Sequence, residues 1–200
     1  MSSSAYISAV EENLKVITTQ RDSLKKSAEI IVQAILNGKM VYVADTYSIL
    51  DSELVERTGG LALFRSLKSN KRQIAPGDVC IIASYHPDME SDLVLLTKTH
   101  TAGAVVITLS PSGKLAQQAD YAIINDTDPH NGVITAQGLS HPFCPISGII
   151  TIALAWGLCA EIISQLMTQG KSPTVYWGNY VVDGAQKLLQ ARKRFSSLGY

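Results

Sequence analysis

The stretch from residue 76 to residue 88, Pro-Gly-Asp-Val-Cys-Ile-Ile-Ala-Ser-Tyr-His-Pro-Asp, decides the fold of this chain. Its centre, Val79–Ala83, is a short, β-branched apolar run between polar turn residues. That pattern is typical of a strand buried on both faces of a parallel sheet. A helix-like segment follows, and then a second apolar strand at 104–109. Two buried strands joined by a helix predict a βαβ unit, whose crossover is right-handed in nearly every protein.

The ends of these two strands mark the predicted site. In open α/β sheets, ligands bind beyond the carboxyl ends of the strands. Ser84 and His86 follow the first strand, while Thr108, Ser110 and Ser112 lie at the end of the second. Hydroxyl and imidazole groups suit a small polar ligand. We therefore expect a small-molecule site at this edge of the sheet.

The remaining pattern predicts one α/β domain over residues 1–200. Further strands are expected at 40–44 and 121–124 with a short edge strand within 61–67, and helices at 49–57, 144–168 and 181–197. Apolar residues at helical spacing up to Asn37-Gly38 predict a long N-terminal helix with a break near Thr19. We expect residues 1–37 to form an arm that contacts another subunit of a homodimer or homotetramer.

Composition argues against several functional classes. The chain has 17 basic and 17 acidic residues and so no formal net charge, and no basic run is interleaved with aromatic residues. We therefore expect no nucleic-acid partner. The longest apolar stretch is too short to span a bilayer, and the start does not read as a signal peptide. Three cysteines without a C-x-x-C motif indicate buried, reduced thiols in a cytoplasmic protein.

The order and spacing of several motifs resemble the single-domain SIS (sugar isomerase) proteins related to phosphoheptose isomerases. The resemblance covers nearly the whole chain and depends on the following motifs: Asn37-Gly-Lys before a strand, Ser48 in the first loop, Glu53-x-x-x-Arg-x-Gly-Gly60, Pro76-Gly-Asp-Val leading to Ala-Ser84, Gly103-Ala-Val-Val-Ile-Thr108, Leu115-Ala-x-x-Ala-Asp120 and Pro145-Ile-Ser147. It implies a three-layer α-β-α sandwich with a five-stranded parallel sheet. It also implies a phosphosugar site in serine- and threonine-rich loops. We expect no cofactor.

Two loops depart from that family's pattern. The family's Gly-x-Gly-x-Ser is Ala-Asp-Thr-Tyr-Ser at residues 44–48, and its Ser-x-Ser-Gly is Ser-Tyr-His-Pro at residues 84–87. Pro87 has no N–H to donate to a phosphate. Asp88, Glu90 and Asp92 complement the dipole of the next helix but also repel a dianion. A cationic His86 offsets part of that repulsion, and the pattern leaves open whether phosphate is bound in the family's mode.

The resemblance also assigns the expected chemistry. Aldose–ketose isomerisation needs a general base, and Glu53 holds that position in the family pattern, although an i, i+4 ion pair with Arg57 is the structural alternative. His86 and His141 are further catalytic candidates. The expected ligand-binding residues are Thr46, Ser48, Ser84, Thr108, Ser110 and Ser112. The histidines lack the short spacings of a zinc site, so we expect no metal.

Two functions follow from these observations. The first is a protein that binds a sugar or sugar phosphate and acts as an aldose–ketose isomerase. The alternative is a non-catalytic module for ligand sensing or assembly, which keeps the fold but has altered phosphate loops. A dinucleotide-binding enzyme is disfavoured because the Gly-x-Gly-x-x-Gly fingerprint is absent from the sequence.

Overall fold

The central element of the structure, a computed structural model, is one all-parallel sheet. Residues 3–69, 72–126, 132–178 and 181–200 are described. The strand order is β2-β1-β3-β4-β5, and the strands are β1 (Val41–Asp45), β2 (Phe64–Ser66), β3 (Val79–Ala83), β4 (Val105–Ser110) and β5 (Tyr121–Ile124). Because the order reverses between β1 and β3, the carboxyl ends of these two strands form the switch point of the sheet.

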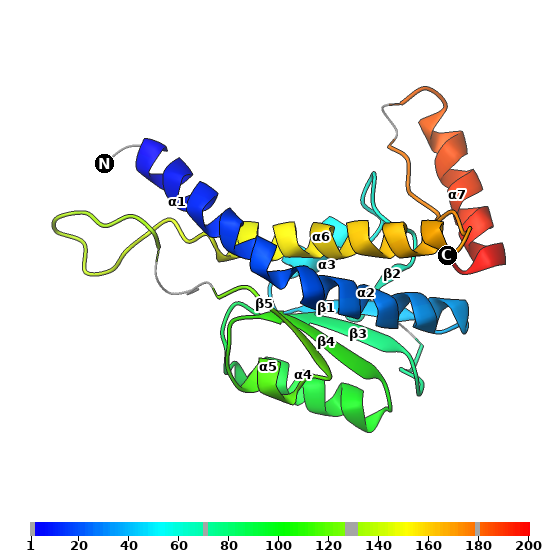
Figure 1. Cartoon of the computed structure of the whole chain (residues 1–200), viewed down its shortest axis with the longest axis horizontal. Helices are drawn as coiled ribbons and strands as arrows, with labels where there is room; N and C mark the ends of the chain where they lie inside the picture. The colour runs from blue at the N-terminus through cyan, green and yellow to red at the C-terminus, as the bar shows by residue number, and fades with distance from the viewer. Residues whose placement is uncertain (1–2, 70–71, 127–131, 179–180) are drawn as a thin grey trace.

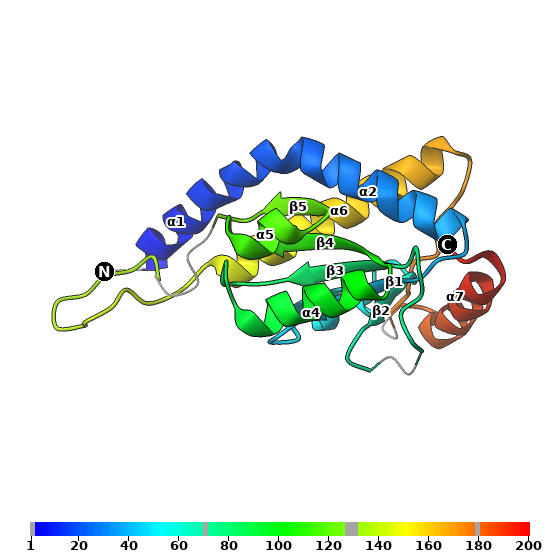
Figure 2. The same ribbon diagram turned by 90° about the horizontal axis from the view of Figure 1, so that it is seen from below.

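Helices cover both faces of the sheet, as the predicted three-layer sandwich requires (Figures 1 and 2). One layer contains α2 (Arg21–Leu36), α3 (Ile49–Leu54) and the long α6 (Ser147–Thr168). The other layer contains α4 (Glu90–Thr101) and α5 (Lys114–Gln118). The last helix, α7 (Gly184–Leu198), lies beyond the β2 edge (Figure 2).

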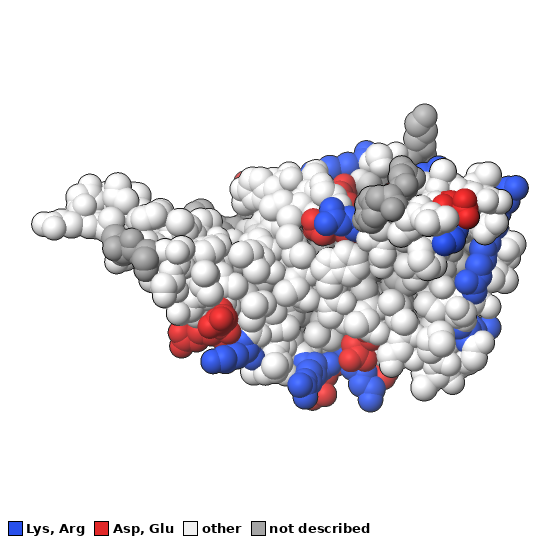
Figure 3. Space-filling view, turned by 90° about the horizontal axis from the view of Figure 1, so that it is seen from above, with Lys and Arg blue, Asp and Glu red and all other residues white. Residues whose placement is uncertain are grey.

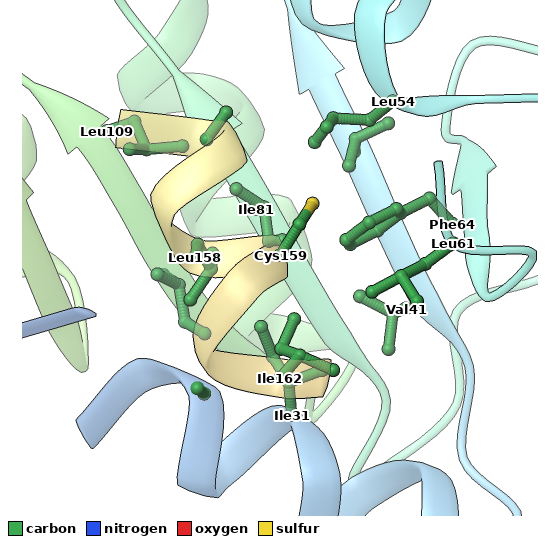
Figure 4. Packing of buried hydrophobic residues seen from close by; sticks show 14 of the residues in the cluster. Ile31, Val41, Leu54, Leu61, Phe64, Ile81, Leu109, Leu158, Cys159 and Ile162 are labelled. Carbon is green, nitrogen blue, oxygen red and sulfur yellow. The ribbon is translucent and has the colours of Figure 1, made fainter. Parts of the chain in front are cut away.

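The core divides along the pleat of the strands, because successive side chains point to opposite faces. Val43 and Ile81 belong to the large cluster shared with α2 and α6, whereas Tyr42 and Ile82 belong to the smaller cluster beneath α4 and α5. Figure 4 shows the α6 residues that pack in the larger cluster. Burial on both faces explains why these strands read as continuous apolar runs.

The N-terminal helix has the break that the sequence predicts. It consists of α1 (Ser3–Val16), a 3-10 turn η1 (Ile17–Gln20) and α2. The side chain of Gln20 accepts a hydrogen bond from the N–H of Ile124 at 3.0 Å, which ties the break to the end of β5. Apolar residues of α1 pack against the main core cluster of the same chain, while its N-terminal end projects beyond the sheet (Figure 1).

Three details differ from the sequence-based expectation. The helix after β1 ends at Leu54 rather than near residue 57, because Val55 adopts an extended backbone. Cys144 is exposed, whereas Cys80 and Cys159 are buried as expected. Among the described helices, α6 alone is long and apolar enough to cross a membrane; however, one side of it packs against the sheet and α2 as a core helix does.

Candidate functional site

A pocket of about 390 Å³ lies beside the carboxyl ends of β1 and β3. We call it the switch-point pocket. Its walls come from the loop after β1, the loop after β3 and the first turn of α6, and they include Tyr47, Tyr85, His86, Met89, Ser147 and Gly148. The volume is within the range of small-molecule sites. The pocket therefore lies at the edge of the sheet where the sequence predicts a ligand.

Two tyrosines form the aromatic wall of this pocket. The ring centroids of Tyr47 and Tyr85 are 5.8 Å apart and the ring planes are tilted by 55°. Tyr47 is 60% exposed, whereas Tyr85 is buried. The phenol hydroxyl of Tyr85 has no hydrogen-bond partner among the described residues. Burial raises the pKa of Tyr85, and the nearby Asp45 carboxylate raises it further, so the phenol stays a neutral donor.

Asp45 ends β1 beside this aromatic wall. One carboxylate oxygen accepts a hydrogen bond from the N–H of Leu50 in the first turn of α3. The other oxygen is buried and has no partner within the described parts of the chain. Burial raises the pKa of Asp45, and the Leu50 hydrogen bond opposes that rise. A buried acid and a buried phenol, each with an unsatisfied oxygen, therefore meet near the pocket.

Three of the predicted ligand hydroxyls bond to other parts of the protein. The Ser84 hydroxyl donates to the carbonyl of His86 at 2.8 Å and thus closes its own loop. The Thr46 hydroxyl donates to Asp92 at 2.8 Å. The ammonium of Lys68 donates to the Ser48 hydroxyl at 2.8 Å. None of the three hydroxyl residues lines the switch-point pocket.

The other three predicted hydroxyls lie on or after β4. Thr108 and Ser110 are fully buried, and their hydroxyls have no partner in the described structure. Ser112 donates to Asp126 at 2.8 Å. These three side chains are also absent from the lining of the pocket. The structure therefore brings His86 into the pocket and leaves the six predicted hydroxyl residues outside its lining.

The loop after β3 is locked onto the loop after β4. The N–H of Leu115 donates to the carbonyl of Pro87 at 3.1 Å, and the N–H of Lys114 donates to Asp88 at 2.9 Å. Gly113 lies so close to Pro87 that a Cβ at Gly113 would approach the Pro87 Cβ to 2.3 Å. Asp88 therefore bonds to the first turn of α5, whereas the sequence suggests that it complements the start of α4.

The catalytic candidates do not converge on one point. Glu53 forms an ion pair with Arg57 at 3.6 Å, and it follows Ile49, a pocket-lining residue, by one helical turn. His86 accepts a hydrogen bond at Nδ1 from the N–H of Asp88 at 3.2 Å, which leaves the proton of the neutral ring on Nε2. His141 is exposed in the segment before α6 and does not line the pocket.

Sequence reasoning missed the apolar part of the site. Tyr47, Tyr85 and Met89 belong to the loops that the sequence selects, but the family's pattern in those loops points to hydroxyl groups for phosphate. The Pro-Ile-Ser motif at residues 145–147 marks the start of α6 without indicating that its first turn faces the pocket. No group of three or more His, Cys, Asp or Glu side chains that suits a metal ion occurs among the described residues.

Comparison with known proteins agrees with the fold and leaves the activity open. No family model matches the chain. A UPF0309 protein of Geobacillus thermodenitrificans is 25% identical over 225 residues, covering 91% of this chain and 90% of the relative. A UPF0309 protein of Shouchella clausii is 22% identical, covering 86% and 89%. These names state no activity.

Solved structures confirm the predicted resemblance. A phosphoheptose isomerase from Francisella tularensis aligns with a TM-score of 0.58 at 13% identity and covers 81% of this chain and 98% of that one. The sugar isomerase domain of an RpiR transcription factor from Sphaerobacter thermophilus aligns with a TM-score of 0.57 at 17% identity, covering 96% and 97%. The chain therefore has the SIS fold. At these identities the likeness establishes the fold alone.

Proposed function

We propose that this protein binds a sugar or sugar phosphate in the switch-point pocket. The observation that carries the proposal is the placement of two tyrosine rings and His86 around a pocket at the β1–β3 switch point. Aromatic faces pack against the C–H face of a sugar ring. The Tyr85 hydroxyl and one Asp45 carboxylate oxygen are buried behind this wall without a partner among the described residues, and a shift of the Tyr85 side chain on binding would let them act as donor and acceptor for the ligand. Similar solved structures include a phosphoheptose isomerase and a sugar isomerase domain, which supports this choice of ligand.

The surroundings of the pocket favour the uncharged part of such a ligand. None of the described lining residues is Lys or Arg, Pro87 offers no N–H, and Asp45 repels a dianion. A phosphate group would instead meet the start of α6. This helix of 22 residues has no side-chain cap, and the N–H groups of residues 147–149 precede the first bond of the helix, from Ile150 to Ile146.

Ligand binding is tested by calorimetry and thermal shift with free hexoses, hexose phosphates and heptose phosphates. We expect at least one sugar to bind and to raise Tm, and Tyr47→Ala to weaken that binding. Trp177→Ala is the matched control, because Trp177 is an exposed aromatic residue outside the pocket. If no sugar binds the wild type, or if both variants bind equally well, the proposal is wrong.

Aldose–ketose isomerisation is the second candidate function, with Glu53 as the base. It is favoured by the position of Glu53, which is half-buried and one turn beyond the pocket wall at Ile49. The test follows the conversion of any sugar that binds. Glu53→Gln should abolish turnover, while Glu56→Gln, an exposed neighbour, should not. Full turnover by Glu53→Gln would exclude this role, and binding without turnover by the wild type would indicate the non-catalytic sensing module.

We also propose that the protein is a cytoplasmic homodimer or homotetramer that assembles through the N-terminal arm of residues 1–37. The end of α1 and the segment of residues 132–146 project past the sheet on the same side as the pocket-forming start of α6 (Figure 1). A second copy on this side would limit access of water to the pocket. The two buried thiols, Cys80 and Cys159, suit a reducing compartment.

A further inference from the structure

A second pocket, of about 570 Å³, lies at the β2 edge of the sheet between the end of α3 and α7. We call it the α7 pocket. Its polar lining includes Glu56, Arg65, Ser66, Ser69 and Arg192. It shares no lining residue with the switch-point pocket. Its size suits a small molecule, and none of the catalytic or ligand residues predicted from the sequence lines it.

Arg65 is held rigidly at this pocket. Its Nη1 donates to the carbonyls of Ala62 and Phe64 at 2.7 and 2.8 Å. Its guanidinium carbon lies 4.7 Å from the ring centroid of Phe195 on α7. The Nε and Nη2 groups of Arg65 have no acceptor among the described residues. A planar guanidinium fork that is already fixed in place matches a phosphate or carboxylate with little loss of conformational entropy.

Arg192 supplies a second and more mobile guanidinium from α7. Its Nη2 lies 3.4 Å from both carboxylate oxygens of Glu56, and both side chains are more than half exposed. Such a long, exposed ion pair contributes little to stability. The Glu56 carboxylate is therefore a weakly held partner of Arg192, and another anion can displace it. The end of the molecule that carries α7 also gathers Lys and Arg side chains (Figure 3), which attract anions.

We propose that the α7 pocket binds the phosphate group of a small molecule between Arg65 and Arg192, in competition with Glu56. Two guanidinium groups against one carboxylate leave this pocket with a net positive charge. The switch-point pocket differs, because its described lining includes neither Lys nor Arg. The proposal is independent of sugar binding at the switch-point pocket.

The test is calorimetric titration with inorganic phosphate at constant ionic strength, using chloride as the background anion. We expect saturable binding to the wild type. Arg192→Ala should weaken it about tenfold, because a charge-assisted hydrogen bond is lost. Glu56→Gln should strengthen it about two- to fivefold, because the competing carboxylate is removed. Lys193→Ala is the matched control, since it removes one exposed charge from α7 outside the pocket lining and should leave affinity unchanged.

The comparison of Arg192→Ala with Lys193→Ala separates a built site from general charge attraction, because both explanations predict a gain in affinity for Glu56→Gln. General attraction would make Lys193→Ala lose as much affinity as Arg192→Ala, and that result would overturn the proposal. Absence of saturable binding to the wild type, or a Glu56→Gln protein that binds no tighter, would overturn it as well. Tyr47→Ala should leave phosphate binding intact, so failure here and failure at the switch-point pocket are distinguishable. All of these substituted positions are exposed, so the variants should fold.

Discussion

Gly113→Ala tests whether the loop after β4 locks the loop after β3. A Cβ at Gly113 would stand 2.3 Å from the Cβ of Pro87 and 3.1 Å from its Cα and carbonyl oxygen. The φ of Gly113 is 166°, an extended conformation that any residue adopts. The expected effect therefore comes from the steric contact alone. Because Pro87 is a rigid ring and part of the contact is with backbone, the two loops must separate.

The size of the effect follows from what the separation disturbs. Overpacking of this kind costs about 1–3 kcal/mol. Separation also weakens two hydrogen bonds, from Leu115 to Pro87 and from Lys114 to Asp88, each with a net contribution of about 1 kcal/mol. We expect the free energy of unfolding to fall by about 2–4 kcal/mol. For a chain of this size, that corresponds to a fall in Tm of about 5–15 °C.

Urea unfolding followed by circular dichroism, together with thermal melts, measures this change. Gly148→Ala is the matched control, because a Cβ there meets nothing within 4 Å and its φ is not positive. It should lie within about 1 kcal/mol of wild type, since alanine is the better helix former. If Gly113→Ala is within about 0.5 kcal/mol of wild type, the usual range of surface substitutions, the two loops are not locked together.

Three further predictions concern the buried polar groups and the arm. Burial raises the pKa of Asp45 above its ordinary 3.8. In the pH range between the pKa of the unfolded state and the raised pKa of the folded state, the folded state binds more protons, so the free energy of unfolding falls as pH rises through that range. Asp45→Asn keeps an acceptor for the Leu50 N–H and should remove this part of the pH dependence in urea titrations; an unchanged slope would contradict the assignment. Tyr85→Phe removes a hydroxyl without a partner and should raise the free energy of unfolding of the ligand-free protein by about 1 kcal/mol while weakening sugar binding, and a loss of stability would count against that reading. Ile7 and Leu139 are exposed, so the variants Ile7→Glu and Leu139→Glu should lower the oligomer mass in sedimentation without lowering Tm, whereas a monomeric wild type would refute the proposed assembly.

Local patterns in the sequence were sufficient to predict the sheet and its long N-terminal helix. Val79–Ala83 is buried over its whole length. A strand between two layers of helices must be apolar on both faces, so consecutive residues in its sequence are apolar. The break near Thr19 is likewise local, since it appears as the 3-10 turn η1. The carboxyl-end location of the pocket followed from the sheet class, because parallel strands place all their ends at one edge.

The composition of the pocket was decided by the tertiary structure. Sequence reasoning selected Ser48 and Ser84 for their hydroxyls, but Lys68 and the loop carbonyl of His86 occupy these groups. Such a choice of partner depends on the direction of a side chain and on residues far apart in the chain.

The chain by itself thus determined which segments form the sheet, at which edge of the sheet the pocket lies and which two loops depart from the pattern of the family that it resembles. Packing in three dimensions decided that Pro87 lies against Gly113 and that the first turn of α6 completes the pocket. It also brought Arg65 and Arg192, more than a hundred residues apart, to one pocket. A strand buried on both faces needs consecutive apolar residues, so its burial is visible in the local sequence. Contacts between loops and helices leave no such local pattern and arise only once the layers are packed.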